Sequence, residues 1–165
     1  MTVALSVVGK SDVGKTTLLE KLLPELKQRG YRVATIKHDV HGFDIDLPGK
    51  DSWRHAQAGS DAVIITSAQK LALIKKMDHD APLEELRGLL GLGYDIILAE
   101  GFKDSPELKI EVHRRERGAI LCTEEEMVAL VTDEALALAV PQFGFNEIGE
   151  LSDFLEERFL RRYGE

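Results

Sequence analysis

Apolar residues recur along the chain in two patterns that predict alternating strands and helices. Short apolar runs indicate strands, which we expect at residues 3–8, 32–37, 62–66, 71–75, 94–99 and 127–131. Apolar residues spaced three or four apart predict helices, which we expect at residues 15–29, 82–92 and 146–162. This alternation indicates an α/β domain of three layers with a mostly parallel sheet.

Residues 108–113 carry a different pattern, in which apolar and polar side chains alternate. The polar positions are Lys109, Glu111 and His113. Successive side chains of a strand point to opposite faces of the sheet, so the pattern predicts a strand with one exposed face. We expect this strand to lie near an edge of the sheet.

The first predicted strand leads into a loop that matches the phosphate-binding pattern G-x-x-x-x-G-K-[ST]. The matching residues are Gly9, Lys10, Ser11, Asp12, Val13, Gly14, Lys15 and Thr16. Its glycines allow backbone N–H groups to approach a phosphate, and the following helix adds the positive end of its dipole. Lys15 supplies a charge for the β- and γ-phosphates, Thr16 offers a hydroxyl to Mg²⁺, and Thr17 can reach the α-phosphate. Residues 9–17 are therefore the predicted nucleotide site of a P-loop NTPase-like domain.

Two more residues at predicted strand ends complete the expected catalytic group with Lys15. If the strand at 94–99 runs parallel to the first strand, Glu100 lies at the same sheet edge as Thr16 and can serve the Mg²⁺. Asp95 then lies roughly 16 Å away, at the other end of the strand. Lys37 ends the second strand and could neutralise a phosphate or simply lie in solvent.

A long polar connection at residues 38–50 separates the second strand from a short helix predicted over 51–58, which Asp51 and Ser52 can cap. The connection contains His38, Asp39, His41, Asp44 and Asp46. Three interpretations stay open: a switch-like loop that senses the γ-phosphate, a metal site with Asp46 as a candidate ligand, and a solvated polar loop.

Recognition of the nucleotide's base has one candidate residue. Asn146 is the only Asn in the chain and Glu147 follows it, so an Asn-Lys-x-Asp base-reading motif is impossible. Asp133 follows a predicted strand and could accept hydrogen bonds from the purine, or it could be a turn residue. The basic run containing His113, Arg114, Arg115 and Arg117 could be a solvated face, or it could receive a phosphate group or an acidic partner.

Length, charge and cysteine content narrow the class of protein. A chain of 165 residues predicts one domain over residues 1–165. The formal net charge of −8 argues against a nucleic acid or an anionic membrane surface as partner. Cys122 is the only cysteine and lies in an apolar run, which predicts a buried structural thiol in a reducing compartment. No stretch is long enough to span a membrane, and we expect a cytoplasmic protein.

Several short segments together resemble the molybdopterin-guanine dinucleotide biosynthesis protein B family. The resemblance covers about residues 3–133 and rests on the phosphate loop, Ile36-Lys37-His38, Asp44 to Asp46, Pro48-Gly49-Lys50-Asp51-Ser52, Ala58-Gly59, Glu100-Gly101-Phe102-Lys103 and Lys109-Ile110-Glu111-Val112. It implies a GTP-binding adaptor in molybdenum cofactor maturation, with GTP and Mg²⁺ bound at residues 9–17. It also implies a homodimer that acts beside the guanylyltransferase that attaches GMP to molybdopterin. Molybdoenzymes are a further expected partner, and the phosphate that the basic run at residues 113–117 could receive would then belong to a pterin.

The function we expect is therefore a slow GTPase that serves as an accessory protein in molybdenum cofactor biosynthesis. Slow hydrolysis is expected because the sequence offers no clear glutamine or arginine to act on the attacking water. Two alternatives stay open. One is a small-molecule kinase that binds its acceptor with the loop at residues 37–51, and the other is a nucleotide-binding scaffold that does not hydrolyse.

Overall fold

The computed structural model describes residues 2–161, which divide into two compact units. One unit lies within residues 1–38 and 83–165, and the other comprises residues 39–82. A single domain over residues 1–165 stays a prediction.

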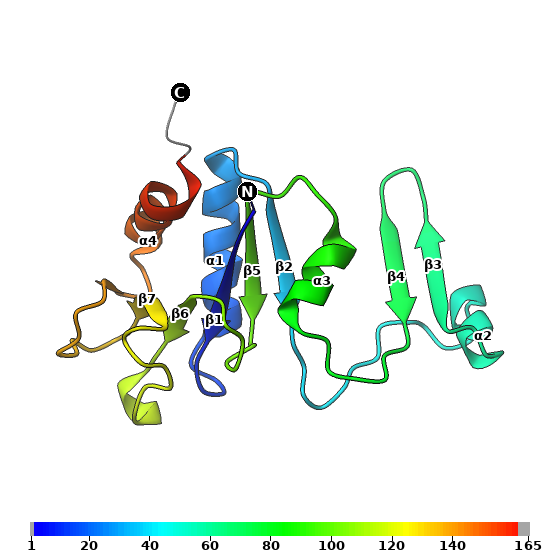
Figure 1. Cartoon of the computed structure of the whole chain (residues 1–165), viewed down its shortest axis with the longest axis horizontal. Coiled ribbons are helices and arrows are strands. Elements are labelled where there is room, and N and C mark those ends of the chain that lie inside the picture. Colours follow the sequence, from blue (N-terminus) through cyan, green and yellow to red (C-terminus); the bar gives the residue numbers. More distant parts are fainter. Residues whose placement is uncertain (1, 162–165) are drawn as a thin grey trace. The chain divides into compact units, whose positions relative to one another are not determined.

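The first unit is built on a six-stranded parallel sheet (Figure 1). Its strands, in spatial order, are β2 (Val33–Lys37), β5 (Ile96–Glu100), β1 (Val3–Val8), β6 (Lys109–Val112), β7 (Met127–Val131) and β8 (Gln142–Phe143). All five pairs of neighbours are parallel. The sheet and its flanking helices confirm the predicted α/β class, and the carboxyl ends of the strands meet at one edge, where ligands bind in such sheets.

Helices cover one face of this sheet through leucine side chains. The helical elements of the unit are α1 (Lys15–Gln28), α3 (Leu83–Leu90), the 3₁₀ turn η1 (Arg115–Arg117), α4 (Ile148–Leu155) and the π-helical turn η2 (Glu156–Leu160). Buried residues of α1 and α4 join those of β1, β5, β6 and β7 in one core, which includes Leu22, Leu26, Leu98, Ile110 and Leu155. No helix within residues 2–161 is long and apolar enough to cross a membrane.

A second, smaller apolar cluster covers the other face beside β1 and β7. Val8 and Leu130 belong to it, whereas their strand neighbours Val7 and Val131 belong to the main core. Adjacent side chains of a strand point to opposite faces, so the two clusters lie on opposite sides of the sheet. Cys122 is buried in this second cluster, as predicted. Burial raises the pKa of its thiol to about 12.

The prediction for residues 108–113 was wrong about exposure and position. The strand β6 lies between β1 and β7, and all four of its residues are buried. Lys109 and Glu111 are only 2% and 1% exposed. The Lys109 ammonium donates to the Ser105 carbonyl and pairs with Glu126 at 3.2 Å. Each polar side chain is thus satisfied by a partner inside the protein, which permits an alternating strand in the middle of a sheet.

Two backbone N–H groups hold the Glu111 carboxylate. Leu121 donates to its Oε1 at 2.6 Å and Cys122 donates to its Oε2 at 2.8 Å. Glu111 therefore fixes the loop that follows η1 against the centre of the sheet.

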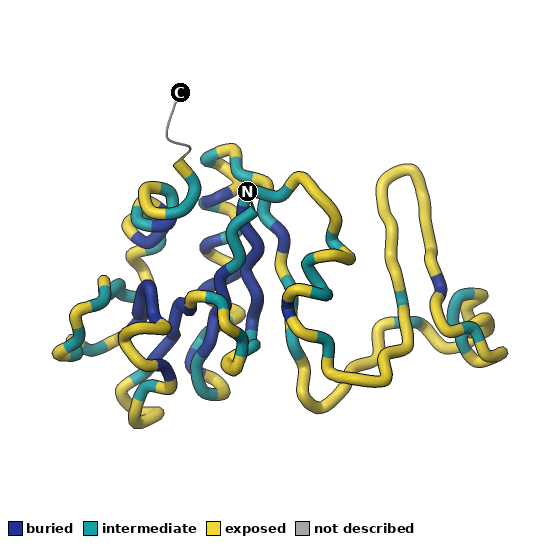
Figure 2. The backbone as a smooth tube through the Cα atoms, in the orientation of Figure 1, coloured by how far each residue is buried: buried dark blue, intermediate teal, exposed yellow. Residues whose placement is uncertain are grey.

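The second unit contains α2 (Asp51–Gln57) and an antiparallel hairpin of β3 (Ala62–Thr66) and β4 (Leu71–Lys75). The hairpin matches the two predicted strands, and most of its residues are exposed (Figure 2). The predicted cap of the helix was wrong: Lys50 is the N-cap and makes no side-chain cap bond. The reason is local, because the Ser52 hydroxyl donates to Asp46 at 2.9 Å.

Candidate functional site

The loop at residues 9–14 joins β1 to α1 with a backbone that depends on its two glycines. Gly9 and Gly14 have φ angles of 145° and 103°, in the range that favours glycine. A Cβ at Gly9 would collide with the carbonyl oxygen of Val112, at the end of β6. The loop therefore lies against the neighbouring strand and opens at the N-terminus of α1, which is the place for an anion.

Lys15 turns back over this loop. Its ammonium donates to the carbonyl oxygens of Gly9 at 2.9 Å and Lys10 at 2.7 Å. Burial lowers the pKa of Lys15, while the nearby Glu100 carboxylate opposes that change. The charge of Lys15 is thus held at the centre of the loop by bonds that a phosphate oxygen can replace.

Glu100 brings the predicted catalytic residues together at the end of β5. Strand β5 runs parallel to β1 and β2, and Glu100 pairs with Val7 of β1 and with Lys37 of β2. The predicted direction of β5 is therefore confirmed. Glu100 is 8% exposed, and its two carboxylate oxygens lie 2.9 and 3.1 Å from the Thr16 hydroxyl. Its Oε1 also accepts from the Lys37 ammonium at 3.2 Å.

Asp95 takes the position that the strand direction predicts. It precedes β5 by one residue and accepts the backbone N–H of Arg32 at 2.8 Å, before β2 begins. Glu100 and Asp95 therefore lie at opposite ends of one strand, and only Glu100 contacts the phosphate loop.

On the other side of the loop, Asp133 and the basic run meet. The Asp133 carboxylate accepts the backbone N–H of Arg115 at 2.9 Å and an Nη1–H of Arg114 at 3.2 Å. The hydrogen bond from the Arg115 N–H is the main cause that holds the pKa of Asp133 below its usual range. The hydrogen bond and the charge of Arg114 act in the same direction. Asp133 is thus an ionised acceptor at neutral pH, two strands away from the phosphate loop.

Sequence reasoning missed Phe145, which lies after β8 and beside the loop. The Arg114 guanidinium lies 4.0 Å from the centre of the Phe145 ring, and its Nε donates to the Val13 carbonyl at 3.2 Å. The residues are 31 positions apart in the sequence, and no spacing or composition signal joins them. Of the basic run, Arg114 is therefore built into the site and is not simply a solvated side chain.

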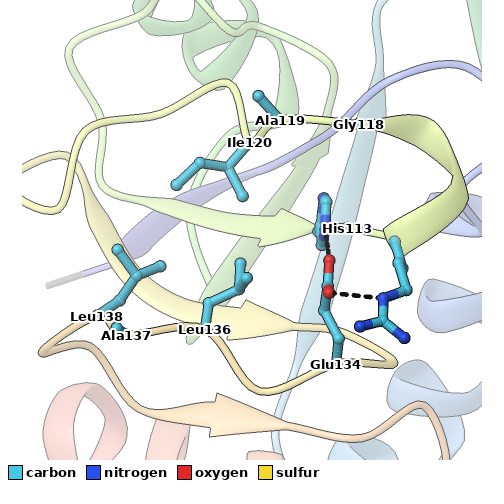
Figure 3. Close-up of a pocket in the computed structure, with 9 residues that line it drawn as sticks. His113, Gly118, Ala119, Ile120, Glu134, Leu136, Ala137 and Leu138 are labelled. Carbon is cyan, nitrogen blue, oxygen red and sulfur yellow. Dashed lines mark hydrogen bonds and ion pairs between the residues drawn. The ribbon is translucent and has the colours of Figure 1, made fainter.

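An open groove of about 510 Å³ is lined by residues of the segments that follow β6 and β7 (Figure 3). His113 and Glu134 form one end, where His113 Nε2 and Glu134 Oε1 are 2.8 Å apart. Arg115 pairs with the other oxygen of Glu134 at 3.2 Å. Ile120, Leu136 and Leu138 form the apolar wall. His113 is thus buried against a carboxylate.

The polar connection belongs mainly to the second unit, which contains residues 39–82. Asp46 accepts the Leu47 N–H and the Ser52 hydroxyl with Oδ1, while its buried Oδ2 has no hydrogen-bond partner among the described residues. No group of three or more His, Cys, Asp or Glu side chains in the described chain could hold a metal ion. The role of Asp46 as a metal ligand stays a prediction.

Comparison with known proteins gives a consistent family. A model of the molybdopterin guanine dinucleotide synthesis protein B family matches residues 4–133. Molybdopterin-guanine dinucleotide biosynthesis adapter proteins from Haemophilus influenzae and Escherichia coli are 39% and 35% identical. The alignment with the Haemophilus influenzae protein covers 92% of this chain and 86% of that protein. The alignment with the Escherichia coli protein covers 97% of this chain and 95% of that protein.

Solved structures agree with these relatives. A crystal structure of molybdopterin-guanine biosynthesis protein B aligns with a TM-score of 0.71 and 28% identity, covering 94% of this chain and 99% of that one. The Bacillus subtilis structure shares the fold at a TM-score of 0.70 and 24% identity, covering 92% and 97%. This chain therefore belongs to the molybdopterin guanine dinucleotide synthesis protein B family.

Proposed function

We propose that the protein is a GTP-binding adapter in the biosynthesis of molybdopterin guanine dinucleotide. The observation that supports nucleotide binding is the hydrogen bond from the Thr16 hydroxyl to Glu100, at 2.9 Å. Thr16 directly follows Lys15, the lysine of the phosphate-loop pattern. The adapter part comes from the relatives, whose names give that role. We expect the protein to act in the cytoplasm.

The residues at this sheet edge fit Mg²⁺ as a partner of the nucleotide. Magnesium prefers oxygen ligands and commonly takes one or two from the protein, with phosphates and waters completing its shell. The Thr16 hydroxyl and the Glu100 carboxylate offer that donor set. When bound, Mg²⁺ would neutralise phosphate charge, and Lys15 and Lys37 would add two positive charges from the protein.

Asp133 supports a preference for guanine. A carboxylate that accepts two hydrogen bonds keeps lone pairs for further donors. Guanine presents N–H donors on its Watson–Crick edge, whereas adenine presents an acceptor at the corresponding ring nitrogen, which a carboxylate repels. We expect GTP to bind more tightly than ATP and Asp133→Ala to reduce that preference; equal affinities for both nucleotides in the unmodified protein would contradict it.

Hydrolysis by the isolated protein should be slow. Lys37 and Lys15 can stabilise negative charge, but neither Thr16 nor Lys37, which contact the Glu100 carboxylate, is a glutamine or an arginine of the kind that acts on the attacking water. A partner would supply the missing group. A fast turnover by the pure protein, measured as phosphate release, would show that a catalytic residue has been missed.

The exposed hairpin of the second unit supports a homodimer. Ile64 and Leu71 are 61% and 65% exposed, and within the described chain β3 and β4 form a sheet of only two strands. An isolated hairpin is marginally stable in water, and a second copy would cover these side chains. Ile64→Lys should shift the sedimenting mass toward the monomer. The guanylyltransferase and molybdoenzymes are the further partners that we propose.

Calorimetric titration tests the proposal directly. GTP, ATP and GDP are titrated with and without Mg²⁺ into the unmodified protein and into Lys15→Ala, with Lys27→Ala, in the last turn of the same helix, as a matched control. We expect Mg²⁺-dependent binding that Lys15→Ala abolishes. Absence of binding to any nucleotide would overturn the proposal and favour a scaffold without a nucleotide site. Turnover that depends on an added small acceptor would favour the kinase alternative.

A further inference from the structure

The contact between Arg114 and Phe145 joins two strand ends beside the phosphate loop. Arg114 follows β6 and Phe145 follows β8. Both side chains therefore lie at the edge of the sheet formed by the carboxyl ends of the strands, where the phosphate loop follows β1. The guanidinium carbon lies 4.0 Å from the ring centre. The Arg114 side chain is 35% exposed and Phe145 is partly buried, so the pair is neither core nor free surface.

Two hydrogen bonds fix the orientation of the guanidinium. Nε donates to the Val13 carbonyl at 3.2 Å, and Nη1 donates to Asp133 at 3.2 Å. The N–H bonds of a guanidinium lie in its plane, so these bonds leave its two faces for stacking. Phe145 covers one face. The other is a flat, charged surface of the kind on which nucleobases stack.

The phosphate loop passes directly along this pair. A Cβ built at Gly14 would lie 3.6 Å from Phe145 Cε1 and 3.9 Å from Arg114 Nη2. A ligand held by the N–H groups of this loop therefore has a planar wall within reach on the β6–β8 side. On the β5–β2 side the same loop meets Glu100 and Lys37.

This division of groups indicates what the wall accommodates. Glu100, which suits a metal, and Lys37 lie on the β5–β2 side, whereas the β6–β8 side carries the stacked pair, the Asp133 carboxylate and the exposed side chains of Arg115 and Arg117. Asp133 would repel a phosphate but can accept from the N–H groups of a base. The pairing with Asp133 also reduces the net positive charge that Arg114 offers to an anion.

We propose that Arg114 and Phe145 form the stacking wall for the purine ring of the nucleotide, with Asp133 reading its edge. The proposal rests on the proposed nucleotide binding and deepens it. Stacking tolerates any purine, so the wall sets the affinity for nucleosides in general, whereas Asp133 sets the preference between guanine and adenine.

Calorimetry with three ligands tests the proposal: GTP, ATP and inorganic tripolyphosphate, which has no base. The variants are Arg114→Ala and Phe145→Leu. Their matched controls are Arg115→Ala, an exposed arginine of the same run, and Phe143→Leu, whose ring packs 5.7 Å from Phe154. Each variant's urea midpoint shows whether it is folded.

We expect Arg114→Ala and Phe145→Leu to weaken both GTP and ATP by about tenfold, within the range for loss of one stacking contact. Tripolyphosphate affinity and the ratio of GTP to ATP affinity should stay unchanged, and the two controls should bind like the unmodified protein. Asp133→Asn should change the ratio of the two affinities.

Two results would overturn the stacking wall. One is an equal loss of tripolyphosphate and GTP affinity, which would make Arg114 a phosphate contact or a support of the loop. The other is unchanged binding of all three ligands by both variants. If instead the unmodified protein binds none of the three ligands, the proposed nucleotide binding itself fails, and the two failures are thereby distinguished.

Discussion

Replacing Glu100 by Gln should change GTP binding in opposite directions with and without Mg²⁺. Glu100 lies 2.9 Å from the Thr16 hydroxyl and 3.2 Å from the Lys37 ammonium, and it is nearly buried. Without metal, its negative charge opposes a polyphosphate in the loop. A charge pair about 4 Å apart is worth at most about 4 kcal/mol at an effective dielectric constant of about 20. The open site screens this, so we expect a gain of about 1–2 kcal/mol, or about 5- to 30-fold.

With Mg²⁺ present the same change removes an oxygen anion from the metal's surroundings. We expect a loss of about 10- to 100-fold in Mg²⁺-dependent affinity, as is usual when a group that supports a metal is neutralised. Calorimetry in a chelator and at several Mg²⁺ concentrations measures both effects. Asp95→Asn is the control, because it makes the same chemical change at the other end of β5. A similar change in affinity under both conditions, or a larger Mg²⁺ effect for Asp95→Asn, would refute the metal assignment.

Three further predictions concern single residues. Lys15→Ala should abolish triphosphate binding and leave the urea midpoint nearly unchanged, because its two hydrogen bonds go to partly buried carbonyl oxygens of the adjacent loop and not into the core; unaltered affinity would disprove the phosphate-loop role. Glu111→Ala should lower the free energy of unfolding by about 2–5 kcal/mol in urea titration, since two backbone N–H groups lose their acceptor, and a loss below about 1 kcal/mol would contradict that reading. Burial raises the pKa of Cys122 from 9.0 to about 12, so the unfolded thiol ionises first and stability should fall as pH rises between those values. Urea midpoints at about pH 8 and about pH 10 should show a smaller fall for Cys122→Ala, and an identical fall would exclude the thiol as a cause.

The phosphate loop could be predicted from sequence because its determinants are local. Gly9, Gly14 and Lys15 lie within seven consecutive positions, and the strand before them and helix after them have simple periods. Glu100 was found by a topological argument that needed only the direction of β5, and the parallel register of β1 and β5 fulfilled it.

Strand β6 was misplaced because its polar residues find their partners in later loops. Glu111 is satisfied by the N–H groups of Leu121 and Cys122, and His113 by Glu134. Periodicity measures where apolar side chains point, and it contains no information about whether a buried charge has a partner. Phe145 was missed because its contact with Arg114 is also between residues far apart in the sequence. The two side chains meet only because β6 and β8 end at the same edge of the sheet.

The order of strands in the sheet has a consequence for how the chain folds during synthesis. Strand β5 lies between β2 and β1, and Val3 pairs with Ile96, so neither early strand has its sheet neighbour until β5 has been made. At about 5–20 residues per second the ribosome needs several seconds to cover that interval. During this time α1 can cover one side of β1 and β2, while the edges of both strands lack the neighbour that β5 provides. The strand that ends in Glu100 is therefore also the one whose synthesis first joins the two early strands into a sheet.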